Sequence, residues 1–264
     1  MSNHKLKLTL ALAAALLSGH SAAQDADNDD EKHHSSTNHT SATLPDGFTV
    51  LEHHVKAIGG VEANTEIKSV QMIGRFDMPA MGLGGSIDIK MHEPNMRVMD
   101  IMVDGMGAIK QGTDGKVAWT TQMPGTPPTM LKDEEAQAQI DDADFYGRVK
   151  PREQYTSAET VGEFTFDDKK VYKVKLVDKA GNHSEALYEI ESGLLRKQSF
   201  KESADATAFN TETEFNDYRE IKDGIKMPFE LVVSSPQFEQ VITFTEIKVD
   251  PEFPEGTFDA PGAL

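Results

Sequence analysis

The chain has 264 residues, a formal net charge of −18 at pH 7 and no cysteine. Without cysteine it forms neither disulfides nor thiolate metal sites, and it cannot carry a cysteine-linked lipid. An acidic balance of this size disfavours nucleic acid and anionic membrane surfaces as partners, because like charges repel.

The N-terminal segment predicts export. Lys5 and Lys7 precede an apolar run at residues 8–17, and small residues follow at 21–23. The run is too short to span a bilayer with margin, so the pattern favours a Sec-type signal peptide over a retained membrane anchor. We expect cleavage to remove residues 1–23 and leave a periplasmic protein with a net charge of −20.

The next segment, residues 24–47, holds almost no large apolar side chain. It cannot offset the conformational entropy lost on ordering, so we expect a disordered acidic tail followed by one folded domain over residues 48–264. The tail contains His33, His34 and His39 beside aspartates. A solvated linker is favoured over a weak metal site, because no ligand spacing is enforced.

Two helices are predicted. Apolar side chains recur at helical spacing through residues 48–60, and a glycine pair ends the pattern. Residues 131–145 are rich in Glu, Ala and Gln and form the second. His53 and His54 are adjacent on the first helix and point about 100° apart, so we interpret them as surface or rim histidines rather than ligands of one metal.

Apolar and polar residues alternate through most of the rest of the chain, and turn residues separate the segments. The predicted strands lie at 67–79, 85–94, 95–103, 113–119, 161–168, 169–178, 184–191, 194–203, 208–221, 225–235 and 238–249. Sequential hairpins without βαβ alternation predict a mainly β fold, a curled antiparallel sheet with one apolar face. Two or three helices over the concave face of such a sheet would leave a cavity.

Methionine is concentrated in one region: seven of the twelve methionines fall within residues 75–107. Methionine sulfur can ligate copper, and methionine can also line an adaptable apolar wall. Copper needs ligands that converge, whereas Met91 and the adjacent His92 point to opposite faces of a strand. The alternation favours the apolar wall, although ordinary core packing has the same pattern. We expect the wall that lines the binding cavity, for a variable apolar ligand, to consist of Met72, Phe76, Met78, Ile87, Ile89, Met91, Val98, Met102, Val117 and Trp119.

Signals for catalysis are weak. The glycine-rich segment at 82–86 lacks the Lys-Ser/Thr of a phosphate loop, and no HExxH or plausible GxSxG motif occurs. The acidic pairs lie in predicted turns and a helix end, where solvated carboxylates are normal. We therefore predict no enzyme activity, no cofactor and no metal site.

The order of several segments resembles the LolA family of periplasmic lipoprotein carriers, also described as outer-membrane lipoprotein-sorting proteins. These segments are the helix ending in a glycine pair, GSIDIKMHEPN at 85–95, TDGKVAWTTQMP at 113–124 and the C-terminal hairpin from Tyr218 onwards. Pro94-Asn95 and the Asp-Gly-Lys turn before the tryptophan match the family pattern. The resemblance covers residues 48–260.

The resemblance implies an unclosed half-barrel of about eleven antiparallel strands, with helices as a lid over a concave hydrophobic face. It also implies a cavity that holds lipoprotein acyl chains, an inner-membrane ATP-driven transporter as donor and an outer-membrane receptor as acceptor. The chain departs from the family in its length, its acidic tail and its methionines, and Glu93 stands where a basic residue is usual. Arg75 and Arg97 are the nearby basic residues.

The sequence thus predicts a monomeric periplasmic carrier of lipid or lipoprotein acyl chains. The alternative is a methionine-dependent periplasmic copper-binding protein. A third hypothesis is a module that senses envelope components through the same cavity without transporting them.

Overall fold

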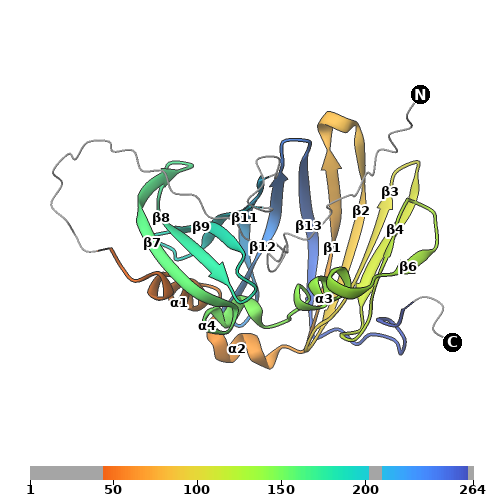
Figure 1. The fold of residues 1–264 in the computed structure, drawn as a ribbon, viewed down its shortest axis with the longest axis horizontal. Helices are drawn as coiled ribbons and strands as arrows, with labels where there is room; N and C mark the ends of the chain where they lie inside the picture. The colour runs from red at the N-terminus through yellow and green to blue at the C-terminus, as the bar shows by residue number, and fades with distance from the viewer. Residues whose placement is uncertain (1–43, 202–209, 261–264) are drawn as a thin grey trace. The chain divides into compact units, whose positions relative to one another are not determined.

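The computed structural model describes residues 44–201 and 210–260. The predicted signal peptide and all but the last residues of the predicted acidic tail lie outside these ranges and stay predictions. Within them the chain forms thirteen strands and four α-helices. Hydrogen bonding orders the strands as β6-β5-β4-β3-β2-β1-β13-β12-β11-β10-β9-β8-β7. The sheet has two free edges, β6 and β7, which confirms the predicted unclosed antiparallel sheet (Figure 1).

The first six strands are β1 (Ser69–Met78), β2 (Leu83–His92), β3 (Met96–Val103), β4 (Gly107–Thr113), β5 (Ala118–Thr121) and β6 (Pro128–Met130). The others are β7 (Tyr155–Phe166), β8 (Lys169–Asp178), β9 (His183–Glu189), β10 (Leu195–Lys201), β11 (Asn210–Lys222), β12 (Ile225–Ser234) and β13 (Glu239–Val249). The helices are α1 (Gly47–Ala57), α2 (Gly60–Glu66), α3 (Asp133–Asp141) and α4 (Pro151–Gln154). Two short 3₁₀ turns lie at η1 (Pro79–Met81) and η2 (Gly147–Val149).

The described residues divide into two compact units. Unit 1 holds residues 67–146 and 242–260, and unit 2 holds residues 44–66 and 147–241 apart from the undescribed segment. The single folded domain over 48–264 stays a prediction.

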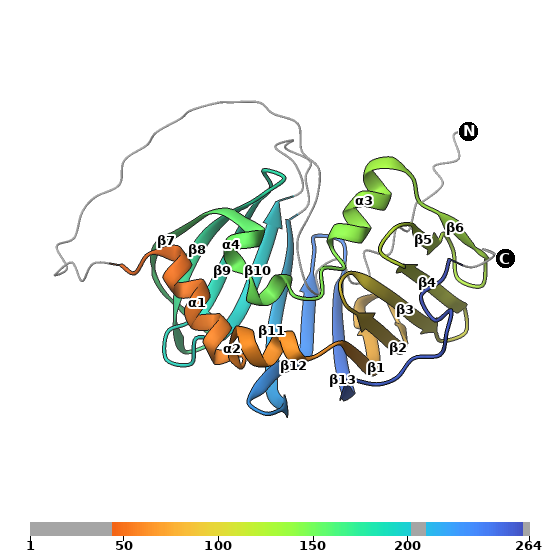
Figure 2. The same cartoon turned by 90° about the horizontal axis from the view of Figure 1, so that it is seen from below.

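Unit 1 is an antiparallel meander. β1 pairs with β2 along its whole length, β2 with β3, and β3 with β4, each in regular register. Helix α3 packs against β4 and β5 (Figure 2). The Asp-Gly turn predicted before β5 forms as expected, with Asp114 Oδ1 accepting from the backbone N–H groups of Lys116 at 2.8 Å and Val117 at 2.9 Å.

Unit 2 begins with α1, whose first turn is capped by Asp46. Its Oδ1 accepts from the backbone N–H groups of Phe48 and Thr49, and this satisfies two donors that a helix start otherwise leaves unpaired. The predicted first helix is confirmed. It also ends at glycine as predicted, because Gly59 has φ +108°, a backbone conformation that favours glycine. A second helix, α2, begins directly after it, which the sequence pattern did not predict. Figure 1 shows α1, α2 and α4 beside the strands of this unit.

Nine of the eleven predicted strands are confirmed to within two residues at each end. β7 begins six residues before its predicted start, and β5 begins five residues after it. The second predicted helix is confirmed as the shorter α3. Besides α2, the sequence pattern missed β4, β6 and α4. β4 is rich in Gly and lacks a clear alternation, β6 has three residues, and α4 has four. Such short or glycine-containing segments carry too few side chains to show a period.

Candidate functional site

The candidate site is the apolar face of β1, β2 and β3 in unit 1. Residues opposite each other in an antiparallel pair share a face, so the register groups the side chains into rows. One row joins Met72, Ile89 and Met99, and the next joins Ile87 to Ile101. All five side chains are buried. We name this surface the α3 face; its buried large apolar side chains are Val70, Met72, Phe76, Met78, Ile87, Ile89, Met91, Met99, Ile101 and Val103.

Helix α3 is anchored to the α3 face by an ion pair. Arg97 lies opposite Met91 and therefore on this face. Its Nη1 donates to the backbone oxygen of Asp142 at 3.0 Å, and its Nη2 donates to Asp142 Oδ2 at 2.8 Å. The two side chains are only 5% and 10% exposed. A desolvated charge pair of this kind tolerates the loss of neither partner alone.

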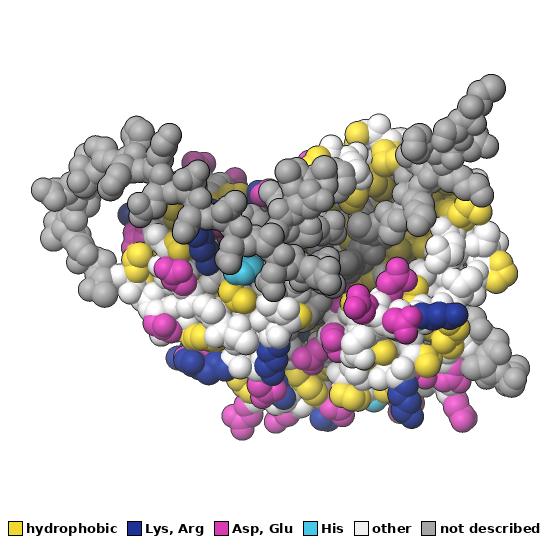
Figure 3. Space-filling view, viewed as in Figure 1, with side chains coloured by type: hydrophobic (Ala, Val, Ile, Leu, Met, Phe, Trp, Pro, Cys, Tyr) yellow, Lys and Arg dark blue, Asp and Glu magenta, His cyan; other side chains and the backbone are white. Residues whose placement is uncertain are grey.

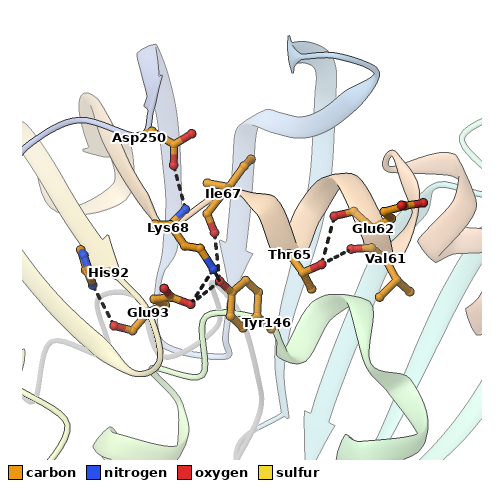
Figure 4. Close-up of polar contacts among 9 residues, drawn as sticks. All are labelled: Val61, Glu62, Thr65, Ile67, Lys68, His92, Glu93, Tyr146 and Asp250. Atoms are coloured by element: carbon orange, nitrogen blue, oxygen red, sulfur yellow. Dashed lines mark hydrogen bonds and ion pairs between the residues drawn. The ribbon is translucent and has the colours of Figure 1, made fainter.

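A second set of polar contacts holds the chain directly after α3 (Figure 4). The Tyr146 hydroxyl donates to Glu93 Oε2 at 2.5 Å, and Lys68 Nζ lies 3.2 Å from the same carboxylate oxygen. The hydrogen bond from Tyr146, and then the one from Lys68, hold the pKa of Glu93 below its usual value. The backbone N–H of Phe145 also donates to the Pro94 oxygen at 2.9 Å. The C-terminal end of α3 is therefore fixed to the β2–β3 turn.

The N-terminal end of α3 has fewer attachments. Its N-cap position is occupied by Lys132, which makes no side-chain capping bond. Ile140 is the buried residue of the helix. Gln139 Nε2 donates to the backbone oxygens of Gly112 at 2.7 Å and Trp119 at 3.2 Å. A short polar helix, packed against β4 and β5, thus lies on the same side of the sheet as the broad apolar face.

The ten residues predicted to line the site do not share one face. Six of them lie on the α3 face: Met72, Phe76, Met78, Ile87, Ile89 and Met91. Val98, Met102 and Trp119 point to the opposite side, because Val98 pairs with Lys90, Met102 with Ser86, and Trp119 with Gly112. Val117 precedes β5 and is 37% exposed.

The opposite side of unit 1 is a separate small core. Val98 and Trp119 pack there against Phe258 and Ala260 of the C-terminal segment. Met102 lies on this side and is 50% exposed. The segment of β3 is apolar on both faces, so its alternation did not indicate which residues belong with Met72 and Ile89. The residues Met99 and Ile101 were missed for the same reason.

The described methionines separate into a buried and an exposed group. Met72, Met78, Met91 and Met99 are buried on the α3 face. The exposed group includes Met81, Met106 and Met123, which lie in or next to the β1–β2, β3–β4 and β5–β6 connections. In a meander these three connections lie at the same end of the strands. Hydrophobic side chains are visible at the exposed end of β1 and β2 in Figure 3.

Unit 2 has its own helix-covered apolar face, which the sequence analysis did not single out. Val50 and Leu51 of α1 pack on Val174, Leu176 and Ala186 of β8 and β9. Figure 2 shows α1 crossing these strands. We name this surface the α1 face.

Titratable groups lie beneath the helices of unit 2. His54 Nδ1 lies 3.1 Å from the Gly193 oxygen and 3.2 Å from the Leu195 nitrogen, and burial lowers the pKa of His54 to about 4. His54 is half-buried with its ring toward the β9–β10 turn, and His53 is exposed; both agree with surface or rim positions. Burial also lowers the pKa of Arg148 to about 10, and its Nη2 donates to Asn64 Oδ1 at 2.8 Å.

Two classes of site find no support within residues 44–201 and 210–260. No three His, Asp or Glu side chains of this part of the chain come together as a metal site requires. Nor does any helix in these ranges combine the length and apolar character needed to cross a membrane.

Solved structures with a similar fold are known. A LolA superfamily protein from Nitrosomonas europaea matches with a TM-score of 0.53 and 14% identity, covering 81% of this chain and 98% of that one. A DUF1329 family protein from Desulfovibrio piger matches with a TM-score of 0.57 and 11% identity, covering 82% and 98%. No family sequence model and no curated protein sequence matches the chain. The chain therefore has the fold of LolA superfamily proteins, as its sequence resemblance predicted.

Proposed function

We propose that this chain is a periplasmic carrier that binds the acyl chains of a lipid or lipoprotein on the α3 face and releases them toward the outer membrane. The observation that carries the proposal is the mismatch between the α3 face and the helix over it. The face presents ten large apolar side chains from three strands, whereas α3 has nine residues and buries one large apolar side chain, Ile140.

The side chains of the α3 face suit a variable apolar ligand. Met72, Met78, Met91 and Met99 have flexible, polarisable side chains that can adapt to acyl chains of different length and shape. Each methylene removed from water contributes about 0.8 kcal/mol, so an acyl chain supplies ample affinity even after ordering costs.

Release requires that the cover can move. The C-terminal end of α3 is held by the Arg97–Asp142 pair and the Tyr146–Glu93 hydrogen bond. Its N-terminal end lacks a side-chain cap and starts with Asp133 at φ +48°. We infer that α3 opens from its N-terminal end when cargo enters or leaves.

The cellular role follows from the N-terminal sequence and the fold. A Sec-type signal peptide at residues 1–23 would deliver the chain to the periplasm. As the sequence resemblance implies, its partners would be a donor in the inner membrane and a receptor in the outer membrane. The chain would act as a monomer and without a cofactor, and its role is transport rather than catalysis.

Native mass spectrometry of the mature protein, purified from periplasm without detergent, tests the proposal. Organic extraction of the bound material then identifies the cargo class. We expect a stoichiometric lipid or lipoprotein adduct. A mass equal to that of the bare chain, with no uptake of offered fatty acid or lipopeptide, would contradict the proposal.

A matched pair of variants tests the face. Met91 is buried on the α3 face, whereas Met102 is exposed on the opposite side of a neighbouring strand. Methionine and glutamine have similar length, so Met91→Gln should weaken binding of a fluorescent acyl probe about tenfold and Met102→Gln should leave it unchanged. Circular dichroism establishes that both variants are folded. Equal affinity in the two variants would place the ligand elsewhere.

Copper binding remains a second candidate, because of the position of the exposed methionines. Met81, Met106 and Met123 lie at one end of the strands of unit 1, and thioethers are soft ligands for Cu(I). A Cu(I) titration that raises the melting temperature of the wild type, and not that of a variant with all three changed to leucine, would favour copper. We expect no such difference.

A further inference from the structure

Two polar side chains of unit 2 are fully buried and have no hydrogen-bond partner. Thr213 on β11 and Gln240 on β13 are both 0% exposed. Neither Thr213 Oγ1 nor the two polar atoms of the Gln240 amide, Nε2 and Oε1, has a partner. Buried amide and hydroxyl groups are almost always hydrogen-bonded, so three such atoms at neighbouring positions call for an explanation.

The register places these two residues on either side of Val233. Thr213 pairs directly with Val233 of β12. The backbone N–H of Ser235 donates to the Phe238 oxygen at 2.9 Å, which makes these two residues opposite each other at the β12–β13 turn. Counting back along both strands brings Val233 opposite Gln240. Neighbouring strands lie about 4.8 Å apart, so the two polar residues are about 10 Å apart with one valine between them.

This row of residues belongs to the α1 face. Thr213 also pairs with Gln198, Gln198 with Ala186, and Ala186 with Val174. Val174 and Ala186 pack under α1. The two unpaired side chains therefore point to the helix-covered side of the sheet, among apolar neighbours.

The row of paired residues around Thr213 and Gln240 consists of neutral side chains. The next positions along this face of β11 and β12, Phe215 and Leu231, are apolar. A carboxylate or phosphate would find no counter-charge among these residues and would lose its hydration, which is costly. A neutral group that both accepts and donates hydrogen bonds matches a hydroxyl and an amide.

We propose that Thr213 and Gln240 form a subsite for a secondary amide at the polar end of an acyl chain. The N–H of the ligand donates to Gln240 Oε1, and its carbonyl oxygen, which points to the opposite side of a trans amide, accepts from the Thr213 hydroxyl. An ester offers oxygen acceptors alone and leaves Gln240 Oε1 unpaired. The subsite lies within unit 2. It rests on the proposed function in its general form, a carrier of acyl chains, and names the chemical class of the cargo.

Four ligands with the same sixteen-carbon chain test the subsite on the mature full-length protein: N-methylpalmitamide, methyl palmitate, palmitic acid and hexadecane. Their dissociation constants are measured by displacement of a fluorescent acyl probe. The test variants are Thr213→Val and Gln240→Leu, which keep shape and remove hydrogen bonding. Thr211→Val is the matched control, two residues from Thr213 on the same strand and on the same face.

Because the dissociation constant of each ligand is compared between wild type and variant, the free energy of hydrating the ligand itself cancels. We expect Gln240→Leu and Thr213→Val each to weaken the binding of N-methylpalmitamide at least fivefold and to leave hexadecane within twofold. Thr211→Val should change neither. An equal loss for all four ligands would make the two residues part of the wall, and an unchanged amide affinity would remove them from the site; either result overturns the subsite.

The stability of the ligand-free protein gives an independent readout. Removing a buried polar group that has no partner relieves a desolvation cost, so both variants should melt at or above the wild-type temperature. A lower melting temperature together with unchanged amide affinity would show that the protein itself satisfies these groups, which overturns the subsite. Wild type that binds hexadecane and the ester without preference for the amide refutes the subsite alone. Wild type that binds none of the four ligands refutes the acyl-chain function as well.

Discussion

Arg97 and Arg75 provide a matched test of how α3 is held. Both arginines are ion-paired to an aspartate within unit 1, Arg97 to Asp142 and Arg75 to Asp104. The first pair is 5% and 10% exposed, and the second is 55% and 64% exposed. Because solvent screens an exposed pair, Arg75→Leu should change the free energy of unfolding by about 0–1 kcal/mol.

The buried pair should behave differently. Arg97→Leu leaves the Asp142 carboxylate without its counter-charge, and Asp142→Leu leaves the guanidinium in the same position, so each should cost about 3–5 kcal/mol. Independent effects would add to about 6–10 kcal/mol in the double variant. We expect about 1–3 kcal/mol instead, because both charges are then gone and the main unsatisfied group is the backbone oxygen of residue 142, which Arg97 Nη1 reaches at 3.0 Å.

Urea denaturation of the mature protein measures these differences. The chain has a single tryptophan, Trp119, whose fluorescence reports on unit 1. Simple additivity of the two single variants, or a cost for Arg97→Leu no larger than that for Arg75→Leu, would refute the buried-pair reasoning.

Three further predictions concern packing, pH and the contacts at the end of α3. Gly85→Ala should lower the free energy of unfolding, measured by urea denaturation, by at least about 2 kcal/mol, because the added Cβ would lie 2.8 Å from the Phe76 ring and 1.9 Å from a backbone oxygen. The control is Gly84→Ala, whose Cβ meets mainly the end of a flexible side chain. It should lower the free energy of unfolding by less than half as much. The pKa of about 4 for His54 lies below its unfolded value near 6.5, so the unfolded state binds more protons between these pH values. Stability should therefore be full above pH 6.5 and fall by about 2–3 kcal/mol on acidification to pH 4, and His54→Asn should remove that part of the dependence; an unchanged pH profile would contradict it. Tyr146→Phe removes the hydrogen bond to a carboxylate at 2.5 Å and should cost about 1–2 kcal/mol, and a cost below 0.5 kcal/mol would show that this contact does not stabilise the fold.

The sequence predicted the architecture well because its alternation is regular where the sheet is regular. β8 begins and ends where the pattern does, at Lys169 and Asp178, and the Asp-Gly turn before β5 formed as expected. The pattern is weak where side chains are small or few, and there the strands β4 and β6 were missed. Period-two alternation gives the parity of a residue within its own strand, and hydrogen-bond register is needed to relate one strand to the next.

Because register cannot be read from alternation, only some of the predicted lining residues share one face. Within β1 and β2 the parity was clear, and all six of the residues chosen there lie on the α3 face. β3 is apolar on both sides, so Val98 and Met102 were grouped with residues from which the sheet separates them. Trp119 was grouped with the same lining, and its ring packs over Gly112 on the far side.

The alternation in the sequence already marks Gln240 and Thr213 as polar residues at apolar positions. In the segment FEQVITF at residues 238–244, Gln240 has the same parity as Ile242 and Phe244, so a polar amide occupies an otherwise apolar series. Thr213 has the same parity as Phe215 in TETEF at residues 211–215. A polar residue within an apolar stripe marks a place where a hydrogen bond must be made.

The α3 face and the α1 face therefore offer a ligand different kinds of interaction. Methionine and aliphatic side chains on the α3 face bind by burying surface, which gives affinity that grows with chain length and depends little on chain identity. Thr213 and Gln240 on the α1 face offer hydrogen bonds that a ligand satisfies only with a group of the right kind in the right place. Their burial without a partner lowers the stability of the free protein, and this cost is recovered when a matching amide binds.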